Sequence, residues 1–309
     1  MRRLAAALAA AAACAAHGAD RFSFAVLGDT PYFLHEELAF PRLLASLGPA
    51  GVAFAVHVGD LKHGSAPCTD ELLAARKALL DAAPVPIVFT PGDNDWTDCH
   101  REAAGRFDPL ERLGALRRLF HGGDSSLGRR TIRLERQSAD PRFPAYRENV
   151  RWTYGAVVFV TLNVPGSNNG RTGGADARHE ERMKANFEWL DEAAKRAEAP
   201  DARGLVVFAH ADPRFGRPVR GTDAYAAYRE VLRTHAAWLR KPVLLVHGDG
   251  HRYRVDQPLA DRATGARLAN FTRVEVFGSP AVEWVRIDVD PATPQLFAIG
   301  PGIAPPPAP

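Results

Sequence analysis

The stretch FAVLGD at residues 24–29 is a run of apolar residues that ends in Gly-Asp. Three further apolar runs end in the same way: AFAVHVGD at 53–60, IVFTPGD at 87–93 and LLVHGD at 244–249. Ligands of open α/β sheets bind beyond the carboxyl ends of the strands. Four carboxylates gathered there would repel one another unless cations lay between them, so the pattern predicts a divalent-metal site. The plainer alternative is that Gly-Asp is common turn chemistry.

The ends of the chain differ in composition from its body. Arg2 and Arg3 precede a small and apolar run at residues 4–16, which is typical of a secretory signal peptide, here placed at residues 1–18. The run is too short to cross a membrane, which needs about 20 residues. Residues 11–14 also resemble a lipoprotein cleavage site, but without its usual large apolar residue. We therefore expect one folded domain at 19–300, followed by a Pro-rich disordered tail at 301–309.

Composition and charge narrow the class of protein. The 309 residues are 46% hydrophobic and 24% charged, an ordinary globular balance. Loss of Arg2 and Arg3 with the signal peptide lowers the formal net charge from +3 to +1. A nearly neutral body gives no electrostatic reason to expect nucleic acid or an anionic membrane as a partner.

The cysteines support export to an oxidising compartment. Cys14 lies in the predicted signal peptide, which leaves Cys68 and Cys99 as a candidate disulfide pair. The bridge would join the loop after Asp60 to the loop after Asp93. The alternative is two unrelated thiols. We expect a periplasmic or secreted protein.

The order of apolar runs and helical patterns predicts an α/β fold. Mostly apolar runs are typical of parallel strands buried on both faces. They lie at residues 22–27, 52–58, 85–90, 156–162, 204–209 and 243–247. Helical patterns lie at residues 69–83, with Thr69 as the N-cap, and at 108–120, 178–198 and 223–240. The runs at 269–278, 282–289 and 294–299 alternate more and predict antiparallel strands. Residues 121–151 and 163–178 are predicted to be irregular loops.

Two histidines complete the ordered set, since His210 follows the run at 204–209 and His251 lies two residues after Asp249. With them the chain resembles the calcineurin-like metallophosphoesterases, whose signature is D-x-H, G-D, G-N-H-D/E, a lone His after a strand, and G-H-x-H. Here the order and strand context match over about residues 22–290. The resemblance implies a two-sheet sandwich flanked by helices and a hydrolase that binds two divalent metals.

The resemblance also implies a role for each matching residue. Asp60 would bridge the two metals, and Asp29 and His251 would hold the first. His210, Asp93 and Asp249 would hold the second. A metal-activated water would then attack a phosphate mono- or diester. His247 is the alternative ligand should Asp249 point away, and His57 is interpreted as a core residue.

The chain departs from the signature at four positions. Pro31 replaces the first histidine, where the adjacent Tyr32 could substitute as a ligand. Asp93 replaces Asn and Asp249 replaces His, which makes the site richer in oxygen and favours Mn, Fe or Mg, with Zn possible. Asn94 replaces the histidine that binds phosphate or protonates the leaving group.

An amide can bind phosphate but cannot act as an acid, so Asn94 leaves the proton donor open. We expect Asn94 and Asp95 to be the catalytic residues, with His63 and His100 as further candidate acids. Asn94 and Asn168 are the predicted substrate-binding residues, although residues 163–170 also suit a plain turn. Trp96 either stacks on a substrate ring or packs its loop.

These features favour an exported, monomeric phosphoesterase of a small phosphorylated substrate. A non-catalytic metal-binding relative, acting as a binding module, is the alternative.

Overall fold

The computed structural model describes residues 20–171, 176–217 and 221–302. The predicted signal peptide and residues 303–309 of the predicted tail lie outside these ranges. Within them, no helix has both the length and the apolar character needed to cross a membrane.

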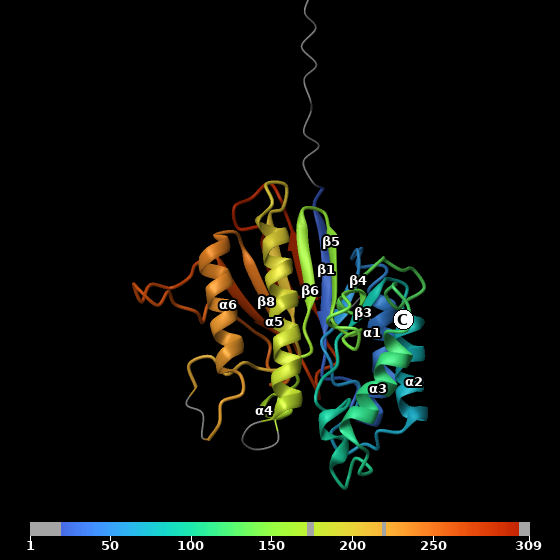
Figure 1. Cartoon of the computed structure of the whole chain (residues 1–309). Coiled ribbons are helices and arrows are strands. Elements are labelled where there is room, and N and C mark those ends of the chain that lie inside the picture. Colours follow the sequence, from blue (N-terminus) through green and yellow to red (C-terminus); the bar gives the residue numbers. More distant parts are fainter. Residues whose placement is uncertain (1–19, 172–175, 218–220, 303–309) are drawn as a thin grey trace, which may run out of the picture.

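Two sheets packed between helices form the predicted α/β sandwich (Figure 1). The five-stranded sheet has the order β12-β11-β1-β2-β3, in which β1, β2 and β3 are parallel and β11 is antiparallel to both β1 and β12. Its strands are β1 (Phe22–Leu27), β2 (Ala55–His57), β3 (Ile87–Phe89), β11 (Val285–Val289) and β12 (Phe297–Pro301).

The seven-stranded sheet has the order β4-β5-β6-β7-β8-β10-β9. Its centre is parallel from β6 to β10, and β4, β5 and β9 are antiparallel to their neighbours. Its strands are β4 (Glu135–Arg136), β5 (Val150–Tyr154), β6 (Val157–Thr161), β7 (Gly204–Phe208), β8 (Val243–His247), β9 (Arg254–Asp256) and β10 (Phe271–Glu275).

Helices cover the outer face of each sheet (Figure 1). On the five-stranded sheet these are α1 (Leu34–Ser46), α2 (Asp70–Asp81) and α3 (Pro109–Phe120). On the other sheet they are α5 (Ala177–Glu198) and α6 (Ala226–Leu239). Single turns form η1 (Thr97–His100), η2 (Gln137–Ala139) and α4 (Gly166–Asn169). The predicted N-cap is confirmed, because the Thr69 side chain accepts a hydrogen bond from Leu72 N at 3.2 Å.

The largely apolar strand runs predicted from the sequence form the parallel strands β1 to β3 and β6 to β8, and each is covered on both faces. Between the sheets, Phe24 stacks on Phe54 at 5.3 Å between ring centroids, and both rings meet Phe159 edge-on. Helices bury the opposite faces. Such two-sided burial removes the polar alternation from the sequence.

Several elements differ from the sequence prediction. The run at 269–278 forms β10, which is antiparallel to β9 but parallel to β8, contrary to the expected antiparallel strand. Residues 248–270 are long enough to return the chain to the start of the sheet without a helix. Helix α1 was not predicted, since Pro41 lies inside it and Leu34 and Leu38 on its surface are exposed. The short edge strands β4 and β9, and β5 beside β4, are also not predicted, because short strands near a sheet edge carry little apolar periodicity.

Truncation of Phe24 tests the core between the sheets. Phe24→Ala should lower the free energy of unfolding by about 3–5 kcal/mol, because it removes a fully buried ring and leaves a cavity. Leu34→Ala is the control, since Leu34 is exposed and its loss should change stability by less than about 0.5 kcal/mol. Chemical denaturation measures both; equal effects would contradict this account of the core.

Candidate metal centre

The predicted ligands lie at the carboxyl ends of five strands. They follow β1 (Asp29), β2 (Asp60), β3 (Asp93), β7 (His210) and β8 (Asp249 and His251). Four of them have positive backbone φ angles: Asp29 at 53°, Asp60 at 60°, Asp249 at 73° and His251 at 57°. Non-glycine residues rarely adopt this conformation, and it persists only where the surrounding structure fixes it. The strained turns therefore belong to the construction of the site.

Two groups of side chains have the composition of metal sites. Donor atoms of Asp29, Asp60 and His210 lie within 4.8 Å of one another, and so do those of Asp93, His210 and Asp249. Five of the six predicted ligands thus converge, with His210 in both groups. Oxygen-rich donors with imidazole suit Mn, Fe or Mg.

Hydrogen bonds at the far side of each imidazole orient it toward the carboxylates. His210 Nδ1 is 2.9 Å from Val58 O, so the N–H lies on Nδ1 and Nε2 faces Asp93 Oδ1 at 3.2 Å. His251 Nδ1 is bonded in the same way to Ser279 O at 2.9 Å, and its Nε2 is 3.5 Å from Asp29 Oδ1. Outer hydrogen bonds of this kind fix the tautomer of metal-binding histidines.

The charges of the centre are strongly coupled. Burial raises the pKa of Asp29 to about 7, and burial also raises the pKa of Asp60 well above its usual range. Burial lowers the pKa of His210, but Asp60, Asp93 and Asp29 outweigh it, so that this pKa is raised well above its ordinary value. These buried carboxylates thus favour positive charge between them, which a proton or a metal cation supplies.

Tyr32, which follows Pro31, reaches the centre with its hydroxyl. This hydroxyl donates to Asp60 Oδ2 at 2.8 Å and lies 3.4 Å from His251 Nε2. Asn94 Nδ2 donates to the same Asp60 oxygen at 2.5 Å and to the Tyr32 hydroxyl at 3.2 Å. Tyr32 and Asn94 therefore both contact Asp60 directly.

Asp95, a predicted catalytic residue, is directed away from the cleft. Its fully buried carboxylate accepts backbone hydrogen bonds from Asp60 and Gly92 at 2.8 Å and from Leu61 at 2.9 Å. Three backbone N–H groups therefore occupy the oxygens of this carboxylate. This geometry favours a positioning role, in which Asp95 holds the loops after β2 and β3 together.

Asn168, a predicted substrate-binding residue, also lies off the cleft, because its side-chain oxygen accepts from Ala224 N at 3.3 Å. Its neighbour Ser167 reaches the centre instead, with Oγ 2.8 Å from Asp93 Oδ2 and from Asp98 Oδ2. One hydroxyl hydrogen serves only one carboxylate. Burial and Asp93 raise the pKa of Asp98 to about 6.

The remaining candidates also have clear positions. His57 is buried, with Nε2 3.1 Å from Thr30 O and Nδ1 accepting from Gly59 N, as its assignment to the core predicts. Trp96 is buried in the core between the five-stranded sheet and its helices, as expected if it packs its loop. Asp249 reaches the cluster, so His247 is not needed as the alternative ligand. His247 is buried, with Nδ1 2.8 Å from Gly248 O.

A cleft of about 430 Å³ opens over the centre. Its lining residues include Tyr32, His63, Asn94, Arg101 and His251. Arg101 is the only arginine or lysine among the described residues that line it. No sequence pattern marks Arg101 or its partner Asp98, whose Oδ2 lies 2.6 Å from Arg101 Nη2.

Glu36 is a further residue that was missed. Its carboxylate is fully buried at the start of α1 and accepts from Tyr32 N at 2.7 Å and from Ser279 Oγ at 2.5 Å. It thereby ties the loop after β1 to the residue that orients His251. No local signal marks it, since acidic residues are common in the first turn of any helix.

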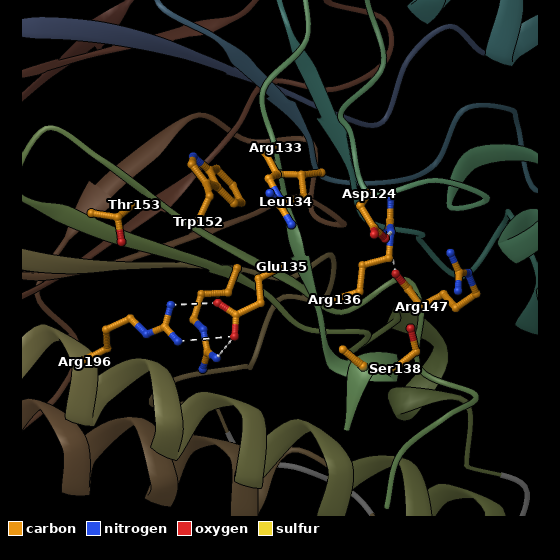
Figure 2. Close-up of a pocket in the computed structure, with 12 residues that line it drawn as sticks. Asp124, Arg133, Leu134, Glu135, Arg136, Ser138, Arg147, Trp152, Thr153 and Arg196 are labelled. Carbon is orange, nitrogen blue, oxygen red and sulfur yellow. Dashed lines mark hydrogen bonds and ion pairs between the residues drawn. The ribbon is translucent and has the colours of Figure 1, made fainter. Parts of the chain in front are cut away.

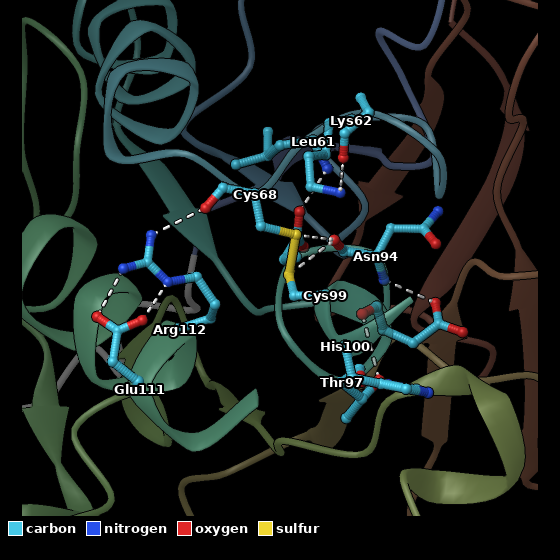
Figure 3. Close-up of a disulfide and its surroundings, with 12 residues drawn as sticks. Leu61, Lys62, Cys68, Asn94, Thr97, Cys99, His100, Glu111 and Arg112 are labelled. Carbon is cyan, nitrogen blue, oxygen red and sulfur yellow. Dashed lines mark hydrogen bonds and ion pairs between the residues drawn. A yellow bond between two sulfur atoms is a disulfide. The ribbon is translucent and has the colours of Figure 1, made fainter. Parts of the chain in front are cut away.

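Cys68 and Cys99 form the predicted disulfide (Figure 3). The bridge links the loop after β2 to η1, the turn that follows Asp93, and both cysteines are fully buried. Arg112 of α3 supports the first loop by donating to Cys68 O at 2.8 Å. The covalent link therefore joins the segments that carry Asp60 and Asp93.

Comparison with known proteins identifies the fold. No protein-family model and no curated protein matches the sequence. Among solved structures, PhoD aligns with a TM-score of 0.58 at 15% identity, covering 92% of this chain and 69% of PhoD. A purple acid phosphatase from yellow lupin (Lupinus luteus) seeds gives 0.53 at 11%, covering 91% and 53%. A 5'-nucleotidase from Candida albicans gives 0.51 at 10%, covering 90% and 50%. The chain thus spans about half of the last two, and it has the calcineurin-like metallophosphoesterase fold that its motifs predict.

Removal of the disulfide tests its contribution to stability. The double variant Cys68→Ser/Cys99→Ser should unfold with a free energy lower by roughly 3–4 kcal/mol, because the bridge closes a loop of about 30 residues in the unfolded chain. Reduction of the wild-type protein should lower its free energy of unfolding by the same amount. Reduction of the variant should leave its free energy of unfolding unchanged. Non-reducing mass spectrometry should find no free thiol at either cysteine; two alkylatable cysteines in the purified protein would contradict the bridge.

Proposed function

We propose that the chain is an exported, metal-dependent phosphoesterase that hydrolyses phosphate monoesters. The observation that carries the proposal is the convergence of Asp29, Asp60, Asp93, His210 and Asp249 beneath an open cleft. The shared fold with two enzymes named as a phosphatase and a nucleotidase supports the same reaction class. The disulfide and the N-terminal pattern support export to the periplasm or beyond.

The donor set fits two divalent cations. Asp60 would bridge them, since its carboxylate lies near Asp29 and Asp93 and its donor atom lies within 4.8 Å of that of His210. Asp29 and His251 would complete the ligands of one cation, and Asp93 and Asp249 those of the other. Cations bound there would polarise the phosphoryl group and lower the pKa of an attacking water.

Arg101 is suited to bind the phosphate itself. Its guanidinium is half exposed in the cleft, and Asp98 Oδ2 and Ser167 Oγ hold it at 2.6 and 3.2 Å from Nη2. A guanidinium held in this way can bind a phosphate oxygen through a charge-assisted hydrogen bond. Asn94, already in contact with Asp60, would add an amide donor beside it.

His63 is the best placed of the candidate acids. It lines the cleft, whereas Asp95 and His100 do not. Its Nδ1 accepts from Ser65 N at 3.1 Å, so Nε2 carries the hydrogen. Tyr32 would take the place of the first histidine, either as a ligand or as a hydrogen-bond donor to Asp60. These two residues would then replace the histidines lost at Asn94 and Pro31.

A metal-binding protein without catalysis is the alternative function. The two missing histidines favour it, because both positions act directly on phosphate or metal in the resembled family. A phosphatase assay that stays silent across a metal panel, with the metals bound, would support this alternative.

The assignment of Asp60 as the bridge predicts its effect on metal content. Asp60→Asn should remove at least one metal per chain and abolish hydrolysis of an aryl phosphate, because an amide is a poor ligand for two cations. Asp124→Asn is the matched control, since Asp124 also follows a glycine but is exposed and does not line the metal cleft. Elemental analysis measures the metals. Two metals retained by Asp60→Asn would exclude the bridging role.

The position of Arg101 predicts a preference for monoesters. A monoester has three non-bridging oxygens and a diester has two, so a cation beside the metal centre gains most from the monoester. Arg101→Ala should lower kcat/KM for an aryl phosphate about 10–100-fold and lower it less for the corresponding diester. Arg106→Ala, an exposed residue of the same loop, should leave both unchanged. Equal losses on the two esters would count against the proposed contact between Arg101 and the phosphate group.

A further inference from the structure

A second cavity of about 650 Å³ lies along the edge of the seven-stranded sheet (Figure 2). Residues of β4, β5, the segment 138–147 and the last turn of α5 line it, and it shares no lining residue with the metal cleft. This arginine pocket is therefore a cavity distinct from the metal cleft.

The pocket is strongly basic. Its lining includes five arginines and two carboxylates: Arg133, Arg136, Arg147, Arg151, Arg196, Asp124 and Glu135. At one end the charges are paired, because Glu135 binds both Arg151 and Arg196 and Glu192 adds a second partner to Arg151. Figure 2 shows Asp124, Arg136, Arg147 and Ser138 at the opposite end.

At that opposite end carboxylates neutralise the arginines less completely, with one exposed partner for Arg136 and none within 4 Å for Arg147 among the described residues. Arg136 is buried, and it donates to the carbonyl oxygens of Gly123 and Arg147. Its nearest carboxylate is Asp124 at 3.6 Å, whose side chain is 72% exposed. Arg147 donates to His121 O at 2.8 Å and to Gly122 O at 3.0 Å, and no carboxylate of the described residues lies within 4 Å of it. Carbonyl oxygens satisfy the N–H groups but do not neutralise the charge.

The neighbouring groups respond to this excess of positive charge. Burial and Arg147 lower the pKa of Arg136 to about 10, and they outweigh Asp124 and Glu148, which raise it. Burial, Arg136, Arg117 and Arg147 lower the pKa of His121 well below its usual value, so His121 is neutral and adds no counter-charge. Positive potential is thus a property of this end of the pocket in the folded chain.

A purely structural role accounts for only part of the lining. Arg136 and Arg147 hold the segment 121–123 through its carbonyl groups. Arg133 is exposed at the pocket and makes no side-chain hydrogen bond or ion pair within the described residues, and the Ser138 hydroxyl makes none either. Free donors beside a guanidinium group without a carboxylate partner, here that of Arg147, are the features of an anion site.

We propose that the arginine pocket binds a phosphate-type oxyanion at a site separate from the metal cleft. Guanidinium groups match the oxygens of a phosphate group in pairs, and the volume leaves room for an organic substituent. The ligand is therefore either free phosphate or the phosphate group of a small organic phosphate. The proposal does not depend on phosphoesterase activity.

Calorimetric titration of the metal-loaded full chain tests this site. Inorganic phosphate and glycerol phosphate distinguish the two sources, and acetate tests whether a carboxylate suffices. Arg147→Gln and Arg133→Gln should each weaken one binding event about tenfold or more, because each removes a charge-assisted contact. Arg133→Gln keeps the experiment informative if Arg147→Gln does not fold, since Arg133 makes no contact that the fold needs.

Arg142→Gln is the matched control. Arg142 lies on the same segment, but it is already paired with Asp140 and Glu188, so phosphate binding should not change. Loss of the event in both test variants and its retention in the control support the site. Phosphate binding that neither variant affects, no event beyond the metal cleft at millimolar phosphate, or acetate binding as tight as phosphate would overturn the proposal.

Discussion

Four aspartates from four strand ends meet where there is little solvent to separate their charges, and the surrounding structure holds them together against this repulsion. Asp29, Asp60 and Asp93 are buried, and Asp249 joins them through His210. The apolar core between the sheets offsets the cost, because it fixes the strands whose ends deliver the carboxylates. The left-handed backbone at several of these residues has the same origin, since a short turn must reverse the chain directly after a buried strand.

Two further buried carboxylates stabilise the site without binding the cluster directly. Asp95 accepts backbone N–H groups from the loops after β2 and β3. Glu36 does the same for the loop after β1 and also holds Ser279, whose carbonyl oxygen orients His251. In both cases hydrogen-bond donors satisfy the negative group, so the loops are positioned without adding cations.

The sequence predicts those parts of the molecule whose structure or role depends on residues that are close together in the chain. Strands such as β7 and β8 appear as apolar runs because both faces are covered, and the ligands follow them directly. Helix α1 escapes prediction because Pro41 and exposed leucines obscure its periodicity. Ser167 and Arg101 escape because their importance arises only when separate loops approach Asp93 and Asp98 in space. The contacts of Asp95 with two loops escape for a related reason, because a buried acceptor of backbone donors and a catalytic carboxylate have the same one-letter code.

The position of β1 has a consequence for how the chain folds. This strand lies between β2, which follows it closely in sequence, and β11, where Phe22 pairs with Val289 near the other end of the chain. The sheet that carries Asp29 therefore closes only after residues 285–289 have been synthesised. Contacts between residues so far apart in sequence slow folding and leave strand edges open in the meantime. We expect the nascent chain to depend on protection of the free edge of β1 until its last strands arrive.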